Sequence, residues 1–174
     1  MGVEKMGKGT LIKSVRARQI FSDRGHPGVE AKVYTQNGAV GVAVAAAGIS
    51  IGEHEIQFVY DNDPKRYNGK GVLKVVANVN DIIGPKIKGL DTMNQREIDQ
   101  IMLDLDGIPL KTNLGGNATA AVSAAVLKAG AAGLGISLYQ HIGGVNACLM
   151  PTPDVGMMHG SERYGGSLGR QTEL

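Results

Sequence analysis

The sequence predicts an α+β domain in which a three-stranded antiparallel meander is followed by about four helices. Three strand-like segments separated by turn signals occupy the first part of the chain, and apolar residues then recur at the spacing of helices. The length of 174 residues fits one domain of ordinary size with a tail. We expect no complete (β/α)₈ barrel in this chain, because that fold needs about 250 residues.

The strands are expected at Leu11–Phe21, Val29–Thr35 and Ala39–Ala46. The first segment alternates apolar and polar residues, as a half-buried strand does. The stretch Arg24–Gly28 is a turn signal, and Asn37-Gly38 is the typical dipeptide of a hairpin. In the third strand, Val40, Val42 and Val44 fall on one face.

Helical periodicity begins after Gly71. Six apolar residues recur at spacings of three and four and are expected on one helix face: Val72, Val75, Val76, Val79, Ile82 and Ile83. A second helix is expected at Asn94–Leu105, with a stripe formed by Ile98, Ile101, Met102 and Leu105.

The third predicted helix, Asn117–Leu134, is rich in Ala, which favours helix and permits close contact with neighbours. Ser137–Ile142 is expected to add a short helix, and Val155–Met158 a possible short strand. The Met150–Pro153 segment breaks regular structure. We therefore divide the chain into an arm at 1–10, a domain at 11–148 and a tail at 149–174.

Composition and charge exclude several classes of protein. A single cysteine, Cys148, rules out an internal disulfide framework and indicates a reducing, cytoplasmic setting. The basic excess lies in residues 1–24, which hold six Lys and Arg against two acidic residues, so the rest of the chain carries no basic patch for nucleic acid. No signal peptide and no membrane span are expected.

Three blocks of the sequence resemble enolases. RARQIFSDRGHPGVEAKVYTQNG (Arg16–Gly38) is similar to the opening of that family, and the blocks Arg66–Pro85 and Leu114–Gly144 follow in the family's order and spacing. The resemblance implies the enolase N-terminal domain, a unit of three strands and four helices that caps a larger barrel. It agrees with the strands and helices expected from periodicity alone.

The resemblance also implies an activity. Enolases are glycolytic lyases (phosphopyruvate hydratases) that remove water from 2-phosphoglycerate, with two Mg²⁺ ions and a Lys base. The Mg²⁺ carboxylates and the Lys lie on the barrel. The N-terminal domain contributes a mobile loop of the form SGASTG, whose first Ser ligates the second Mg²⁺ when the loop closes.

The corresponding loop here is Ala47–Gly52, in which Gly48, Ser50 and Gly52 match the family. Ala47 stands in place of the metal-ligating Ser, and a methyl group cannot ligate Mg²⁺. Ile51 replaces Thr. We therefore expect a loop of lid ancestry and no Mg²⁺ bound by this chain alone.

The tail departs further from the family. Leu149–Pro153 resembles the segment that leads enolases into the barrel. Aligning Leu168 and Gln171 with the family puts Arg163 at the substrate-site His and Thr172 at the acid/base Glu; a two-residue gap would make His159 and Glu173 the candidates instead. His159 and Glu162 have the i, i+3 spacing of metal ligands without an evident third ligand, so a solvated tail is the simpler interpretation.

The remaining polar residues have plainer interpretations. His54 and Glu55 are expected at the surface, His26 in a turn, and Cys148 as an inert small apolar group. By the resemblance, one group of residues lies near a subunit interface, which favours a structural or dimer role: Arg16, Arg18, Arg24 and Glu30.

Three hypotheses follow. The first is an enolase-family protein that does not dehydrate 2-phosphoglycerate by itself. The second is a non-enzymatic interaction module, a homo-oligomer or a chain whose helical and loop face is covered by a protein partner. The third is a lid subunit that acts in trans with a separate barrel chain. Neither nucleic acid nor a membrane is expected as a partner.

Overall fold

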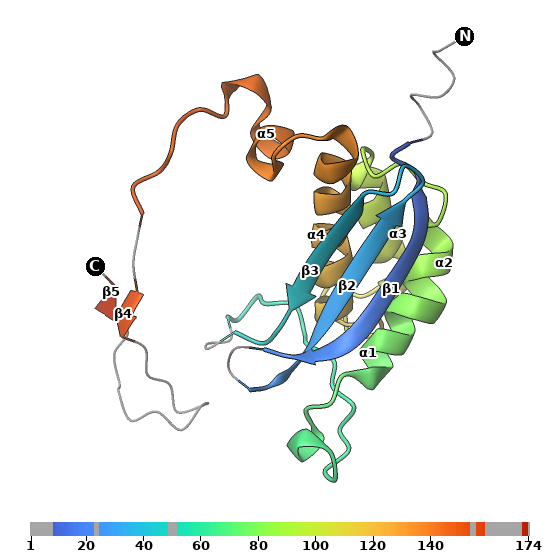
Figure 1. The fold of residues 1–174 in the computed structure, drawn as a ribbon. Coiled ribbons are helices and arrows are strands. Elements are labelled where there is room, and N and C mark those ends of the chain that lie inside the picture. The colour runs from blue at the N-terminus through green and yellow to red at the C-terminus, as the bar shows by residue number, and fades with distance from the viewer. Residues whose placement is uncertain (1–8, 23–24, 49–51, 154–155, 159–171, 174) are drawn as a thin grey trace.

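The computed structural model describes residues 9–22, 25–48, 52–153, 156–158 and 172–173. Its main body is a three-stranded antiparallel sheet with helices on one side (Figure 1). The expected α+β fold is confirmed. The strands are β1 (Ile12–Phe21), β2 (Pro27–Thr35) and β3 (Val40–Ala45), each within two residues of its predicted bounds.

The hairpin between β2 and β3 closes as its sequence predicts. The N–H of Gly38 donates to the carbonyl of Thr35 at 3.2 Å, and the N–H of Thr35 donates to the carbonyl of Ala39 at 3.0 Å. Gly38 has a φ of 87°, a conformation that glycine adopts without steric cost. The turn sets the register, in which Val33 lies opposite Gly41 and Ala31 opposite Ala43.

The helices follow in the expected order. The described helical segments are α1 (Leu73–Ala77), the π-helical η2 (Asn78–Ile83), α2 (Gly84–Ile87), α3 (Gln95–Asp106), α4 (Gly116–Leu134) and α5 (Leu138–Gly143), with short 3₁₀ turns η1 (Tyr67–Gly69) and η3 (Gly144–Asn146). Near the C-terminus, β4 (Gly156–Met158) pairs with β5 (Thr172–Glu173). The expected short strand is thus present, and its pairing partner is a further finding.

The long helix α4 packs directly on β2 and β3. Gly41, Ala43 and Ala45 face it and are buried. The Val residues of β3 share the opposite face, as predicted, and that face is open: Val40, Val42 and Val44 are 40%, 36% and 50% exposed. Small residues therefore face the helix and large ones face solvent.

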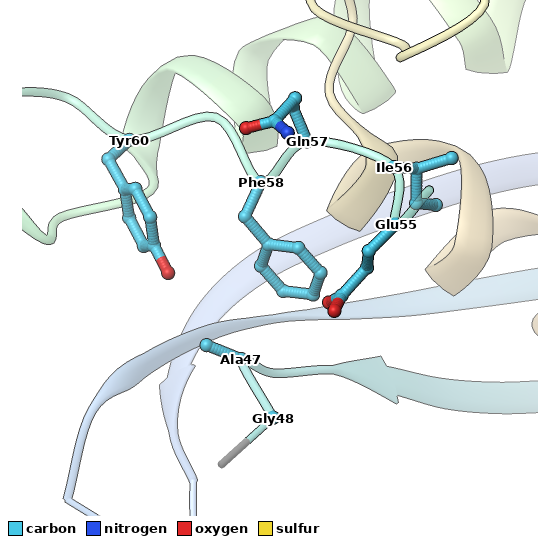
Figure 2. Close-up of a pocket in the computed structure, with 7 residues that line it drawn as sticks. All are labelled: Ala47, Gly48, Glu55, Ile56, Gln57, Phe58 and Tyr60. Atoms are coloured by element: carbon cyan, nitrogen blue, oxygen red, sulfur yellow. The ribbon is translucent and has the colours of Figure 1, made fainter. Parts of the chain in front are cut away.

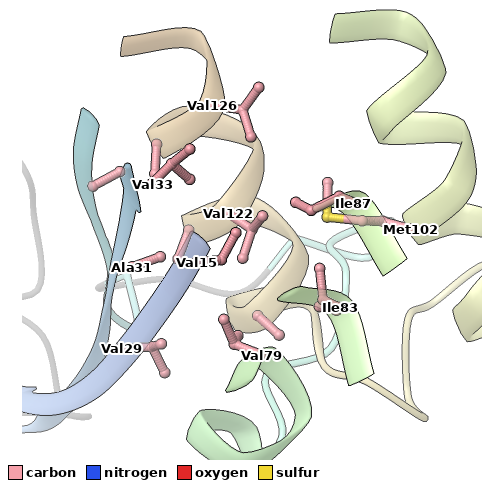
Figure 3. Close-up of a cluster of buried hydrophobic side chains, with 14 of the residues drawn as sticks. Val15, Val29, Ala31, Val33, Val79, Ile83, Ile87, Met102, Val122 and Val126 are labelled. Atoms are coloured by element: carbon pink, nitrogen blue, oxygen red, sulfur yellow. The ribbon is translucent and has the colours of Figure 1, made fainter. Parts of the chain in front are cut away.

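The core lies between the sheet and the helices (Figure 3). Its largest fully buried side chains are aliphatic or Met, as a chain without Trp requires: Ile12, Val29, Val33, Val72, Val75, Val79, Ile83, Ile87, Ile98, Met102, Val122 and Val126. Burial of this apolar surface is the main stabilising term.

One predicted helix face is partly wrong. Ile82 is 41% exposed and Val76 is half-buried, whereas Val75, Val79 and Ile83 are fully buried. The cause at Ile82 is the π-helical turn of η2, whose i→i+5 bonding winds less per residue than an α-helix; Val76 lies before that turn, in α1. In this wider turn, Val79 and Ile83, which are four residues apart, both face the core. Ile82, three residues after Val79, does not.

Among the described helices, none is by itself long and apolar enough to cross a membrane. The run from α4 through α5 and η3 meets that criterion only as a pair bent by 98°.

Candidate functional site

The chain leaves β3 through Ala46–Gly48 and enters the loop that carries the family resemblance. Ile49, Ser50 and Ile51 lie outside the described residues, and the chain is described again from Gly52. Ala47 is only 9% exposed. The base of the loop is therefore packed against the domain.

Ala47 and Gly48 line a small pocket together with the segment that returns from the loop. The cavity is about 80 Å³, and its other lining residues are Glu55, Ile56, Gln57, Phe58 and Tyr60. Figure 2 shows Ala47 and Gly48 on one side and the side chains of Glu55, Phe58 and Tyr60 extending toward them from the other. The two arms of the loop thus meet at this pocket.

The returning arm is fixed by the N-terminus of α4. The N–H of Gly116 donates to the carbonyl of Gln57 at 2.7 Å, and the N–H of Gln57 donates to the carbonyl of Leu110 at 2.8 Å. A Cβ on Gly116 would lie 2.7 Å from Cγ1 of Ile56, so only glycine lets the arm come this close. Backbone pairing therefore sets the position of the pocket wall.

Asn117 adds a second anchor. Its Oδ1 accepts from the N–H of Val59 at 3.2 Å, and its Nδ2 donates to the carbonyl of Val59 at 3.0 Å. Asn117 is 1% exposed, so both bonds are shielded from water. The buried amide fixes the backbone next to Phe58 and Tyr60.

Asp61 continues this arm to the start of α1. Its Oδ2 accepts from the N–H of Leu73 at 2.9 Å, and its Oδ1 accepts from the N–H of Lys74 at 2.8 Å. The Asp61 carboxylate satisfies donors that the first turn of a helix leaves free. The arm is thus held at both ends by helix N-termini.

The carboxylate at the pocket belongs to Glu55, which is half-buried rather than fully at the surface as predicted. Its Oε2 accepts from the N–H of Gly52 at 3.0 Å. The neighbouring His54 is exposed, as predicted. The Glu55 carboxylate therefore holds the backbone at Gly52, where the described chain resumes after the loop.

The residues at this pocket do not fit a Mg²⁺ site. The side chain of Ala47 offers no oxygen, and Oε2 of Glu55 already accepts the N–H of Gly52. Within the described part of the chain, no three His, Cys, Asp or Glu side chains are grouped so that they could hold a metal ion.

A second polar cluster lies on the open face of the sheet. Nε of Arg18 on β1 lies 2.7 Å from Oε1 of Glu30 on β2, and Nη2 lies 3.2 Å from Oε2. Nζ of Lys32 is 3.5 Å from Oε1 of Glu30. The hydrogen bond from Arg18 lowers the pKa of Glu30, and burial opposes that effect. The same bond raises the pKa of Arg18.

The other predicted residues fall in different places. Arg16 is exposed on the same sheet face, and the carbonyl of His26 accepts from the N–H of Ser22 in the expected turn. Cys148 is exposed. In the tail, Thr172 and Glu173 form β5, and Glu173 pairs with Gly156. Four residues lie outside the described part: Arg24, His159, Glu162 and Arg163.

Sequence reasoning missed the residues that position the pocket. The sequence pattern places Asn117 at the start of the predicted helix Asn117–Leu134, but it does not predict that Asn117 or Gly116 holds the returning arm. The available signal is an amide at the start of an Ala-rich helix, where a buried polar group requires partners.

A family model described as "Enolase, N-terminal domain" matches residues 12–142. The match extends from the start of β1 into α5 and covers more than half of the chain. It includes the complete loop and both of its anchors.

Proposed function

Because the chain belongs to the family of enolase N-terminal domains, we propose that it serves as the cap of an enolase-type active site and is not a catalyst by itself. Dehydration of 2-phosphoglycerate then requires a barrel that supplies the metal ligands and the base. The chain contributes the loop at Ala47–Gly52 and the rigid wall behind it.

One observation carries this proposal: the position that holds the metal-ligating Ser in the family is a packed methyl group. Ala47 is 9% exposed and lines the pocket with Phe58 and Tyr60. A side chain of this kind shapes the pocket and excludes water without binding an ion. The cap would therefore act by shaping the pocket and by excluding water when it closes over the barrel.

The anchors support a lid function. The returning arm is tied to α4 by Gly116 and Asn117, while Gly48 and Gly52 flank the connecting residues. A rigid base with a glycine-bordered loop is the arrangement of many active-site lids. Closure over a barrel would bury the pocket.

The proposal is tested with an enolase barrel fragment that lacks its own N-terminal domain. The fragment is titrated with this chain, and phosphoenolpyruvate formation from 2-phosphoglycerate and Mg²⁺ is followed at 240 nm. We expect saturable but slow turnover, and we expect Ala47→Ser to raise it about tenfold or more by adding an oxygen ligand.

Ala46→Ser is the matched control, because it adds the same hydroxyl one residue earlier. It is expected to leave the rate of the mixture unchanged. Failure of the chain to bind the barrel would refute the cap proposal, and equal effects of the two Ser variants would refute the role of position 47.

A second candidate function is an interaction module. Toward the end of the domain, several large apolar side chains are strongly exposed: Tyr139 61%, Ile142 64%, Val145 99%, Leu149 92% and Met150 87%. Apolar side chains gathered in this way are typical of protein contact surfaces. In this alternative, a protein partner covers these apolar side chains and the face formed by the helices and the loop. The complex then has no catalytic role.

The two candidates predict different results for the variant Leu149→Asp/Met150→Asp. A cap requires contact with the barrel, so the variant would lower complementation of hydratase activity. An interaction module without a catalytic role would show binding to the barrel that the variant weakens, with no turnover in any mixture.

A further inference from the structure

The two edges of the sheet differ in how their backbone groups are satisfied. Along the outer edge of β1, the N–H of Ile12 donates to Leu90 at 2.8 Å, and the carbonyl of Ile12 accepts from Gly89 at 2.8 Å. Further along, Oδ1 of Asn80 accepts from the N–H of Ala17 at 2.8 Å, and its Nδ2 donates to the carbonyl of Ala17 at 3.1 Å. This edge is blocked against further strands.

The outer edge of β3 is open. The hairpin bond between Thr35 and Ala39 fixes which residues of β3 turn their backbone groups toward β2. Because hydrogen-bonded and non-bonded pairs alternate in an antiparallel ladder, Gly41, Ala43 and Ala45 bond to β2. The N–H and C=O groups of Val40, Val42 and Val44 point away from it, and no partner for them lies among the described residues.

β3 also lacks the features that usually protect an edge strand. From Ala39 to Gly48 there is no charged residue and no Pro, although natural edges commonly carry Lys, Pro or a bulge. By contrast, β1 carries Lys13, Arg16 and Arg18, and its pairing shows a register irregularity between Ile12 and Ser14. Because β3 lacks this protection and β1 has it, the β3 edge is indicated as a surface for strand addition.

The sequence of β3 is nearly symmetric about Val42. On either side of it come Gly41 and Ala43, and then Val40 and Val44. We propose that a second copy of this chain pairs with β3 in antiparallel fashion, with Val42 opposite its own counterpart. Val40 then lies opposite Val44 of the other copy, and the two sheets join into one of six strands.

This pairing satisfies the requirements of a two-fold interface, in which the same surface complements itself. The free groups of Val40, Val42 and Val44 bond reciprocally, and their side chains form cross-strand Val pairs on the open face. A strand of six residues is about 20 Å long. The interface is therefore small compared with the usual 800 Å² or so per partner, so we expect monomer and dimer to exchange at micromolar concentration.

The inference concerns the sheet edge and does not rest on the cap function. It is tested on the full 174-residue chain by sedimentation velocity over a concentration series. We expect the unmodified chain to shift from monomer to dimer as concentration rises.

Two variants test the register and share the change Val44→Lys, which places the new ammonium opposite Glu30 of its own sheet. In V40E/V44K, Glu at position 40 of one copy faces Lys at position 44 of the other, so the paired charges differ in sign and the dimer should persist. In V40K/V44K, Lys faces Lys, and the dimer should weaken about tenfold or more relative to V40E/V44K. Circular dichroism verifies that both variants fold, since positions 40 and 44 are exposed.

A monomer at every concentration would overturn the proposal. Equal dimerisation of V40E/V44K and V40K/V44K would also overturn it, because a dimer formed elsewhere on the surface would not distinguish them. Loss of the dimer in V40K/V44K but not in V40E/V44K would support both the pairing along the β3 edge and its antiparallel register.

Discussion

Gly41 on β3 lies directly against the backbone of Ala125 in α4. A Cβ at position 41 would overlap the carbonyl oxygen of Ala125 and the amide nitrogen of Ala129. The helix can approach the sheet this closely because its side chains and those of the strand are small. Contact between α4 and β3 therefore depends on one missing methyl group.

The variant Gly41→Ala should be strongly destabilised. The added methyl meets backbone atoms that cannot move independently, so α4 must shift away from the sheet, at a cost of about 1–3 kcal/mol or more. Urea unfolding measures the change. Gly52→Ala is the control, because the nearest atom to its Cβ would be 3.9 Å away; equal stability of the two variants would contradict this packing.

Asp106 should be required for the turn that precedes α4. It is 2% exposed, and its Oδ2 accepts from the buried N–H of Leu114 at 2.7 Å. Asp106→Ala leaves that donor without a partner, so we expect a loss of roughly 1–3 kcal/mol in the free energy of unfolding. Asp104→Ala removes an exposed carboxylate from the same helix and should change little. A loss as large for Asp104→Ala would argue against the buried bond.

Loss of the Asn117 side chain should loosen the wall of the pocket. Asn117→Ala removes both hydrogen bonds to Val59, so the arm at 56–60 should open more often than the rest of the domain. Hydrogen exchange followed by mass spectrometry would show faster uptake in that arm while the peptides of β1 and β2 change less. Asn94→Ala, at an exposed site, serves as control. A uniform change over the whole domain would contradict the anchoring role.

The pair formed by Arg18 and Glu30 should make stability depend on pH in the acidic range. The pKa of Glu30 is lowered in the folded chain, so its carboxylate stabilises the fold above the ordinary value of 4.5 and loses that effect as pH falls through the lowered pKa. Glu30→Gln should therefore melt below the unmodified chain at pH 7, by about 2 °C or less, because the Arg18 side chain of the pair is 65% exposed and solvent screens the charges.

The same difference should disappear at a pH well below 4.5, where Glu30 is protonated in the folded and unfolded states. Glu53→Gln at an exposed position is the control and should melt like the unmodified chain at both pH values. A melting difference for Glu30→Gln that persists in acid would show that packing, and not charge, is responsible.

Local patterns were sufficient to predict most of the fold. Asn37-Gly38 identified the hairpin, and the Ala-rich run predicted α4 to within one residue of its start. Periodicity failed at Ile82 because nothing in the residue types reveals a π-helical turn. The sequence also placed Val40, Val42 and Val44 on one face without showing that this face is open, since the choice depends on where α4 packs.

The site was predictable in part. The glycines of the loop and Ala47 were found through the family resemblance, and the structure places Ala47 and Gly48 at a pocket. The opposite wall could not be predicted, because it depends on contacts between residues far apart in the chain, such as Val59 with Asn117. Long-range pairs of this kind leave no periodic signal.

Assay of the chain alone tests the central claim, that it does not dehydrate 2-phosphoglycerate unless a barrel supplies the metal ligands and the base. Purified chain is incubated at high micromolar concentration with 2-phosphoglycerate and Mg²⁺, and absorbance at 240 nm is followed beside a complete enolase as positive control. We predict no turnover above the blank, with or without Ala47→Ser. Turnover that scales with the concentration of the unmodified chain would contradict the account.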